Sequence, residues 1–414
     1  MSGRVVVTAA GAISPVADSP AGLHAALAAG ESGTKPIELF STEGIGCHQA
    51  GEIRPFDVPS YLGDRNLRPI DRTSRLLLVA AQQALEAGGW TAELRAAREV
   101  GLVLGTTFCS VRTIAEFDRR GLQLGPSHVS PMDFANSVIN AAAGQAAIWH
   151  DLRGVNSTVS GGEASGLLAI AYAADQIRGG RAEALLAGGA EELCFESFLG
   201  FYRAGRLCGS AQRAGAEEHP IPFDTRRNGF SLAEGAAVLL LEAAGAAAER
   251  GAPVLAEVLG HGSAFAAAPD EAGKTVAVAR AVRLALEDAG LASEGVDCLS
   301  VSANGSVVGD RCEAVGVAEA LGTRAASLPV TAIKAMLGEA MGASGGFQAV
   351  AALDTLGSGM LPGIRGLERT EDGFPLPGVA AGSRRIEART VLLTAVGHDG
   401  HCCAVILSAP GGGR

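Results

Sequence analysis

Residues 154–174, GVNSTVSGGEASGLLAIAYAA, place a short strand, a pair of glycines and a helix of small residues in direct succession. The strand is predicted at residues 157–160. Gly161 and Gly162 permit the sharp backbone turn that joins a strand directly to a helix. Glu163 follows them, at a helix N-terminus whose free N–H groups and dipole favour negative charge. Several enzyme folds present a nucleophile on such a strand-turn-helix elbow.

The rest of the chain alternates predicted strands and helices, and it does so twice. In the first half, strands are predicted at residues 4–8, 100–104, 157–160, 184–188 and 236–242, and helices at 71–88, 111–120 and 136–151. In the second half, strands are predicted at residues 254–259, 298–301, 330–333, 390–396 and 402–407, and helices at 275–290 and 341–356. This alternation implies mostly parallel sheets covered by helices. We therefore expect a duplicated α/β fold with halves at residues 1–249 and 250–414.

Composition excludes two classes of partner. The 414 residues suffice for two cores, and 57 glycines with only 4% aromatic residues predict cores of small aliphatic side chains. The net charge of −11 argues against nucleic acid, which requires a basic protein face. No apolar run approaches the ~20 residues that span a bilayer, and the N-terminus enters a predicted strand without a charged-then-apolar leader. We expect a cytoplasmic protein that binds neither nucleic acid nor membrane.

The eight cysteines lack the CxxC spacing of a zinc site, and we expect them to be buried free thiols. Cys402 and Cys403 follow His398 and His401 closely, which could suggest a metal site. A turn between strands with satisfied side chains is the preferred interpretation. The sequence therefore predicts neither a metal nor a cofactor.

Four segments together resemble the β-ketoacyl synthase (ketosynthase) family over essentially the whole chain. The elbow is similar to that family's nucleophile segment. Residues 222–235, PFDTRRNGFSLAEG, resemble its PFDxxRdGFvxgEG stretch, and residues 333–346, IKAMLGEAMGASGG, resemble its K-x-x-x-GHxxGAAG segment. Asp310 and Glu313 resemble the D-x-x-E that follows the family's first active-site histidine. The resemblance implies a thiolase-like α/β fold: two pseudo-symmetric halves in a five-layered αβαβα arrangement.

The chain departs from the family at the three residues that perform the chemistry. Ketosynthases use a cysteine that accepts the acyl group as a thioester and two histidines that stabilise charge during decarboxylation of the malonyl extender. The equivalent positions are Glu163, Asn304 and Glu339. Framework residues Lys334 and Glu313 are retained, and they could pair in the core. No catalytic residue is expected, because a carboxylate cannot replace the thiolate and Glu339 would repel an enolate.

A ketosynthase fold with a replaced nucleophile is similar to the chain-length factor subunits of type II polyketide synthases. The resemblance implies a heterodimer with an active ketosynthase, whose acyl tunnel this chain would wall off, and contact with an acyl carrier protein that holds the chain on phosphopantetheine. Two alternatives stay open. One is a malonyl-carrier-protein decarboxylase or other acyl-transfer enzyme using Glu163, and the other is a module that binds an acyl chain or carrier protein.

Further candidate residues follow from the same resemblance. Four phenylalanines lie in segments that face the dimer seam in this family and could gate the tunnel, although core packing is an equal alternative: Phe108, Phe117, Phe134 and Phe198. Three arginines could meet an acidic carrier protein, although a solvated helix face is the preferred interpretation: Arg112, Arg119 and Arg120. We also expect Glu163 to be an anion that is hydrogen-bonded by Asn304.

Overall fold

The computed structural model describes residues 3–63, 67–210, 218–268 and 270–411, and ten of its strands form a single sheet. The first half contributes β1 (Val5–Ile13), β4 (Gly101–Gly105), β5 (Asn156–Val159), β6 (Ala184–Glu191) and β7 (Gly235–Ala243). The second half contributes β8 (Ala256–Phe265), β9 (Cys298–Ser300), β10 (Val330–Thr331), β13 (Thr390–Val396) and β14 (His401–Ser408). Two small sheets pair β2 (Thr34–Pro36) with β3 (Gln49–Gly51) and β11 (Met360–Leu361) with β12 (Arg384–Arg385).

The large sheet consists of two five-strand parts with the same topology. The order β5-β4-β6-β7-β1 in the first half corresponds to β10-β9-β13-β14-β8 in the second. Each pair of neighbouring strands in the first part has the same relative direction, parallel or antiparallel, as the equivalent pair in the second part. The two parts meet where Val5 of β1 pairs with Val258 of β8. This repeat agrees with the expected duplication. The boundary at residues 249 and 250 stays a prediction; α10 (Ala244–Glu249) lies between β7 and β8.

The expectation of mostly parallel strands is wrong for the middle of the sheet. β4 is parallel to β5 and β6, and β9 is parallel to β10 and β13. In contrast, β1, β7, β8 and β14 run antiparallel to their neighbours. The short turn at residues 397–400 joins β13 to β14, and a tight turn permits only antiparallel pairing.

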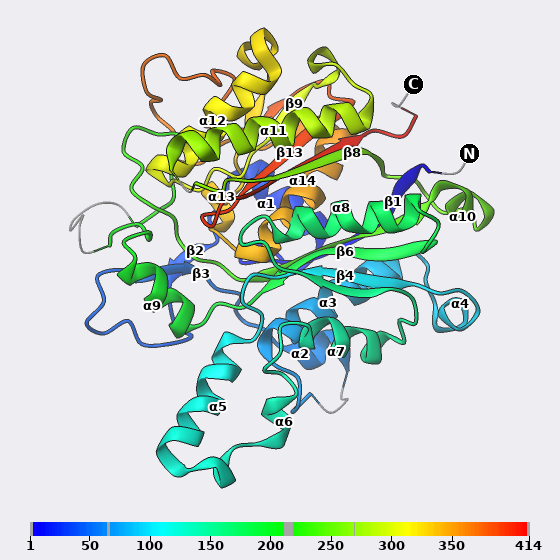
Figure 1. Ribbon diagram of the computed structural model, residues 1–414, viewed down its shortest axis with the longest axis vertical. Coiled ribbons are helices and arrows are strands. Elements are labelled where there is room, and N and C mark those ends of the chain that lie inside the picture. Colours follow the sequence, from blue (N-terminus) through cyan, green and yellow to red (C-terminus); the bar gives the residue numbers. More distant parts are fainter. Residues whose placement is uncertain (1–2, 64–66, 211–217, 269, 412–414) are drawn as a thin grey trace.

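Helices complete five layers, which confirms the expected αβαβα arrangement (Figure 1). α3 (Arg72–Ala87) and α7 (Ala141–His150) cover the first half, and α11 (Glu271–Ala289) and α12 (Val307–Leu321) cover the second. Between them, α8 (Ser165–Arg178) and α14 (Ser344–Ser358) contact strands of both halves. The remaining helices are α1 (Pro20–Ala29), α2 (Val58–Leu62), α4 (Ala92–Ala97), α5 (Val111–Leu124), α6 (Pro131–Phe134), α9 (Phe195–Arg203) and α13 (Lys334–Leu337).

Several predicted boundaries need correction. β1 continues to Ile13, where a turn was expected after residue 8. α7 begins at Ala141, although the small-residue pattern predicted a helix from residue 136. In contrast, α3 has the predicted limits, since the Asp71 side chain caps its N-terminus and Gly88 ends it. None of the helices in the described ranges has the length and apolar character that a bilayer span requires.

The middle layer is dense because its residues are small. A Cβ atom on Gly166 would lie 2.6 Å from the carbonyl oxygen of Gly342, and one on Gly345 would lie 2.5 Å from the Leu167 nitrogen. α5 and α6 instead extend away from the layers (Figure 1). α5 has no buried residue.

Candidate functional site

The elbow forms as predicted between β5 and α8. Gly162 has a φ of 55°, a conformation that suits glycine. Ser165 stabilises the turn, because its Oγ accepts from the Gly161 N–H at 2.9 Å and donates to the Gly162 carbonyl at 2.6 Å. Glu163 is thereby held with only 2% of its surface exposed.

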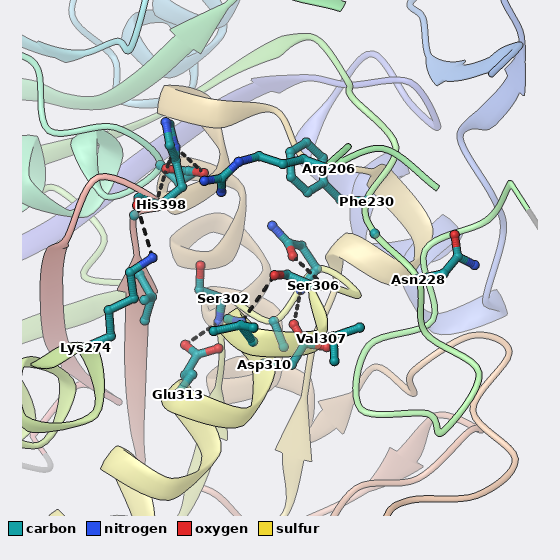
Figure 2. Close-up of a pocket in the computed structure, with 18 of the residues that line it drawn as sticks. Arg206, Asn228, Phe230, Lys274, Ser302, Ser306, Val307, Asp310, Glu313 and His398 are labelled. Carbon is teal, nitrogen blue, oxygen red and sulfur yellow. Dashed lines mark hydrogen bonds and ion pairs between the residues drawn. The ribbon is translucent and has the colours of Figure 1, made fainter. Parts of the chain in front are cut away.

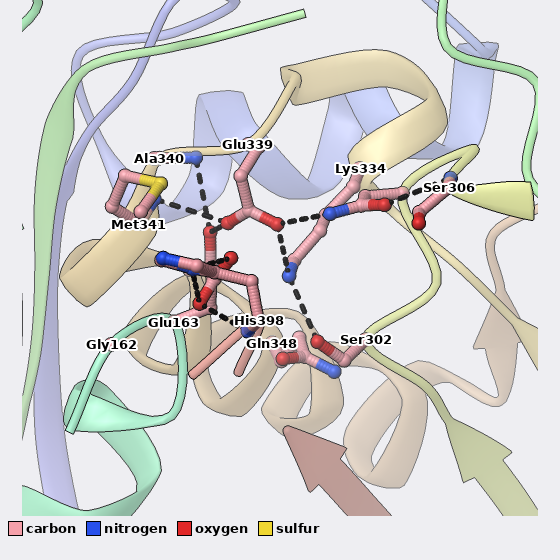
Figure 3. Close-up of polar contacts among 12 residues, drawn as sticks. Gly162, Glu163, Ser302, Ser306, Lys334, Glu339, Ala340, Met341, Gln348 and His398 are labelled. Carbon is pink, nitrogen blue, oxygen red and sulfur yellow. Dashed lines mark hydrogen bonds and ion pairs between the residues drawn. The ribbon is translucent and has the colours of Figure 1, made fainter. Parts of the chain in front are cut away.

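Glu163 is bonded to His398, which lies in the turn between β13 and β14 (Figure 3). The His398 Nδ1 atom is 2.9 Å from both carboxylate oxygens, and the His398 backbone N–H donates to Oε2 at 2.9 Å. Lys274 donates from Nζ to the His398 carbonyl at 3.0 Å (Figure 2). The His398 ring also packs edge-on against Phe201, with centroids 5.6 Å apart. The expected hydrogen bond from Asn304 to Glu163 is therefore replaced by an ion pair with His398.

The two groups shift each other's pKa in opposite directions. Burial acts to raise the pKa of Glu163, but the hydrogen bonds and charge of His398 hold it below its usual value. The hydrogen bond to Glu163 raises the pKa of His398, although burial opposes this shift. The geometry therefore favours a carboxylate bonded to an imidazolium.

Glu339 is the centre of a second buried network (Figure 3). Its Oε2 accepts from Lys334 Nζ at 2.7 Å and from Asn304 Nδ2 at 2.8 Å. Its Oε1 accepts from Ser344 Oγ at 2.7 Å and from the Met341 N–H at 3.1 Å. Glu339 and Lys334 have side-chain exposures of 0% and 2%, so the pair is shielded from water. The structure thus joins Asn304 and Glu339, two of the three positions that were predicted to replace the family's catalytic residues.

Glu313 is not the ion-pair partner of Lys334, which corrects the pairing considered from the sequence. Glu313 accepts from the Ser302 N–H at 2.8 Å and from Thr394 Oγ1 at 2.6 Å. Lys334 donates to Ser302 Oγ at 2.9 Å, so Ser302 connects the two residues. Burial raises the pKa of Glu313 to about 7.

Two neighbouring cavities meet at His398. The first, here called the polar cavity, has a volume of about 360 Å³ and is lined by Glu163, Lys274, Ser302, Asn304, Glu313 and His398 among others (Figure 2). The second, here called the apolar groove, has a volume of about 470 Å³ and is lined by Phe108, Val111, Gly200 and Phe201 among others. Both cavities include Ala204, Arg206 and His398 in their walls.

The four phenylalanine candidates lie in three different environments. Phe108 lines the apolar groove, with its ring 6.0 Å from that of Phe201. Phe117 and Phe134 pack on each other at 6.0 Å on the extended α5 and α6, and Phe134 is 62% exposed. Phe198 is fully buried in a hydrophobic cluster. The structure thus separates one core residue from three that reach a cavity or the surface.

The arginine candidates lie on α5 in surface ion pairs. Arg112 pairs with Glu116, Arg119 with Glu196 and Arg120 with Asp133.

Sequence reasoning missed Lys274 and Arg206, because both come from segments outside the recognised motifs. It assigned His398 no role at the elbow. The two histidines of the turn at residues 397–402 were the available signal, but the distance of this turn from Glu163 along the chain concealed the contact.

The cysteine thiols lie outside the wall of the polar cavity. All eight cysteines are buried and free, as predicted, and none lines the polar cavity. Burial raises the pKa of Cys109, for example, to about 12. In the described part of the chain, no group of three or more His, Cys, Asp or Glu side chains is arranged to hold a metal ion.

Sequence comparisons cover nearly the whole chain. Residues 2–247 match the family model for the beta-ketoacyl synthase N-terminal domain, and residues 255–368 match the model for its C-terminal domain. A 3-oxoacyl-[acyl-carrier-protein] synthase 2 of Vibrio cholerae serotype O1 is 31% identical over 390 residues, which are 93% of this chain and 94% of that protein. The tetracenomycin polyketide synthase ketoacyl synthase beta subunit of Streptomyces glaucescens is 33% identical over 413 residues, 98% of each chain.

Solved structures share the same architecture. The ishigamide ketosynthase/chain length factor superposes with a TM-score of 0.91 at 30% identity, covering 99% of this chain and 100% of that one. A beta-ketoacyl synthase of Burkholderia phymatum superposes with a TM-score of 0.89 at 25% identity, covering 99% and 100%.

Proposed function

Because the chain belongs to the beta-ketoacyl synthase family, we propose that it is a non-condensing chain-length factor subunit of a type II polyketide synthase. In this role it pairs with an active ketosynthase and limits the length of the acyl chain. The resemblance to a ketoacyl synthase beta subunit and to a ketosynthase/chain length factor supports the proposal. An acyl carrier protein that delivers the growing chain is the third component, and a cytoplasmic location stays a prediction.

The ion pair at the elbow is the observation that carries this proposal. Condensation requires a nucleophile that can hold an acyl group as a thioester. Glu163 has both of its oxygens bonded to His398 and is buried, so it is already occupied where a thiolate would attack. No native cysteine lines the polar cavity to take over this role.

The two positions of the family histidines support the same interpretation. A developing enolate needs hydrogen-bond donors that are free to stabilise it. Asn304 donates to Glu339, and Glu339 itself is an acceptor bonded to Lys334. Asn304 and Lys334 thus both donate to Glu339, whose carboxylate stands where an oxyanion would require a donor.

Co-expression with a ketosynthase that retains Cys-His-His tests the proposal. We expect a stoichiometric complex that elongates malonyl units on an acyl carrier protein, and no elongation by this chain alone. The Glu163→Ala variant should preserve elongation by the complex, since its cysteine resides in the partner. Condensation by the isolated chain would contradict the proposal.

Two further measurements test the alternatives. Steady carbon dioxide release from malonyl-carrier protein by the isolated chain, abolished in Glu163→Ala, would favour a decarboxylase. Binding of acyl-carrier protein without stable association with any active ketosynthase would favour a binding module.

A further inference from the structure

His398 lies where the polar cavity and the apolar groove adjoin. Its side chain contacts Glu163 on the cavity side and Phe201 on the groove side. The polar cavity and the apolar groove each include solvent-exposed residues in their walls. Val307 and Val308, at 39% and 42% exposure, line the polar cavity, whereas exposed Gly200 lines the groove.

Three contacts fix the position of His398. Glu163 binds both its ring and its backbone N–H, so the ring and the turn are held by one buried carboxylate. Lys274 holds the carbonyl of the same residue from α11. The remaining charged groups that act on the ring are Arg206 and Asp399. The ring is therefore held by Glu163 in the middle layer, and the backbone of the same residue is held by Lys274 of an outer helix.

We propose that the Glu163–His398 pair is a partition that closes the passage between the polar cavity and the apolar groove. An acyl chain that enters the polar cavity of this subunit cannot continue into its groove. The groove is consequently available only from its outer side. If the proposed function is correct, that side receives the chain of the partner ketosynthase. The partition itself rests only on contacts within this chain.

Tethered alkyl chains test the partition on the full chain without a partner. A Ser306→Cys variant places a thiol in the wall of the polar cavity, whereas the native thiols are buried. Its rate of labelling is measured with methyl and octyl methanethiosulfonate, well below saturation. A matched Val111→Cys variant places the thiol in the wall of the groove. The unmodified chain measures background reaction.

Each thiol variant is combined with Glu163→Gln/His398→Ala, which removes the ring and leaves no unpaired carboxylate. Transfer from water favours a longer alkyl chain by about fourfold per methylene. For Ser306→Cys, the octyl-to-methyl rate ratio should therefore rise more than tenfold when the partition is removed. For Val111→Cys, the ratio should change less than twofold. Glu163→Gln alone, which releases the ring without removing it, should give an intermediate ratio for Ser306→Cys.

The partition would be overturned if the octyl-to-methyl rate ratio of Ser306→Cys were the same with and without the Glu163→Gln/His398→Ala substitutions. An equal rise for Val111→Cys would also overturn it, because the effect would then be general loosening. Circular dichroism confirms that each variant is folded. None of these outcomes depends on product formation, so they are independent of the chain-length proposal.

Discussion

Glu163 and Glu339 are buried carboxylates whose charges are balanced by different cations. Burying an unpaired charge costs several kcal/mol, so each substituted position requires a partner. His398 supplies it for Glu163, and Lys334 supplies it for Glu339. Each of these buried carboxylates is therefore paired with a cation of its own.

The Glu163→Gln variant should destabilise the fold by about 1–3 kcal/mol at pH about 5.5, because a charge-assisted hydrogen bond is lost. His398 has a raised pKa, so its contribution is complete below the unfolded value and is lost as pH rises through the folded value. Glu163 has a lowered pKa, so its contribution is lost as pH falls through that value. The difference in free energy of unfolding between the unmodified chain and Glu163→Gln should thus shrink at high and at very low pH. Urea denaturation across pH and NMR titration of His398 measure both effects.

The surface pair of His261 and Asp175 provides the control. Its atoms are also 2.9 Å apart, but Asp175 is 56% exposed, so Asp175→Asn should cost less than about 1 kcal/mol. An unchanged pKa of His398 in Glu163→Gln would contradict the assignment of the ion pair.

Lys334→Met should cost about 3–5 kcal/mol, since it leaves the Glu339 carboxylate buried without its cation. A second substitution, Glu339→Gln, should recover part of this loss. Denaturant unfolding of Lys334→Met, with and without Glu339→Gln, measures the loss and its recovery. Arg119→Met is the control, because the Arg119–Glu196 pair is partly exposed and should contribute less than about 1 kcal/mol. A loss below about 1 kcal/mol for Lys334→Met would contradict the argument.

At the scale of elements, the contact between α8 and the residues around α14 depends on the absence of side chains. A Cβ atom on Gly166 would lie 2.6 Å from the Gly342 carbonyl oxygen and 3.0 Å from the Gly346 nitrogen, and both of these are backbone atoms. Backbones that approach this closely hold the elbow against residues 339–346. The small-residue pattern of both segments is therefore a packing requirement.

The Gly166→Ala variant should lower stability by about 1–3 kcal/mol or more, because the added methyl group would lie 2.6 Å from a carbonyl oxygen. Gly144→Ala in α7 is the matched control, with nothing within 4 Å of the added atom. It should be neutral or stabilise by up to about 1 kcal/mol, because alanine favours helix. Thermal unfolding measures both. Similar melting temperatures for the two variants would show that the close approach is not restrictive.

At the scale of the whole molecule, two equivalent halves meet across β1 and β8, and α5 and α6 extend from the first half. Large apolar side chains on this extension are exposed, including Leu122 at 87% and Phe134 at 62%. Exposed apolar patches are typical of interaction surfaces. The extension of α5 and α6 is therefore a candidate contact surface for the proposed partner.

Phe108→Ala and Phe198→Ala should separate tunnel gating from core packing. Phe108 lines the groove, so its truncation should lengthen the products of the reconstituted pair while the fold persists. Phe198 is fully buried, so its truncation should cost about 3–5 kcal/mol and leave the product length of the remaining folded protein unchanged. Product mass spectra and unfolding curves measure the two effects. The opposite assignment of effects would contradict the gating proposal for Phe108.

The amino-acid sequence alone predicted the duplicated α/β architecture and the elbow, and it pointed to Glu163, Asn304 and Glu339 as the positions expected to replace the family's catalytic residues. These are local or periodic properties: strand and helix patterns, the Gly161–Gly162 turn, and motifs in which Glu163, Asn304 and Glu339 can be read directly. The helix limits at Asp71 and Gly88 were predictable for the same reason, because capping acts between neighbouring residues.

Only the tertiary structure decided which charges meet. Asn304 bonds Glu339 rather than Glu163, and Lys334 bonds Glu339 rather than Glu313, although all of these side chains were candidates. His398, 235 positions from Glu163, reaches it because the strand that follows its turn, β14, packs against α8. Pairing of buried charges depends on ångström-scale positions set by packing between distant segments, and no local pattern in the sequence encodes those distances.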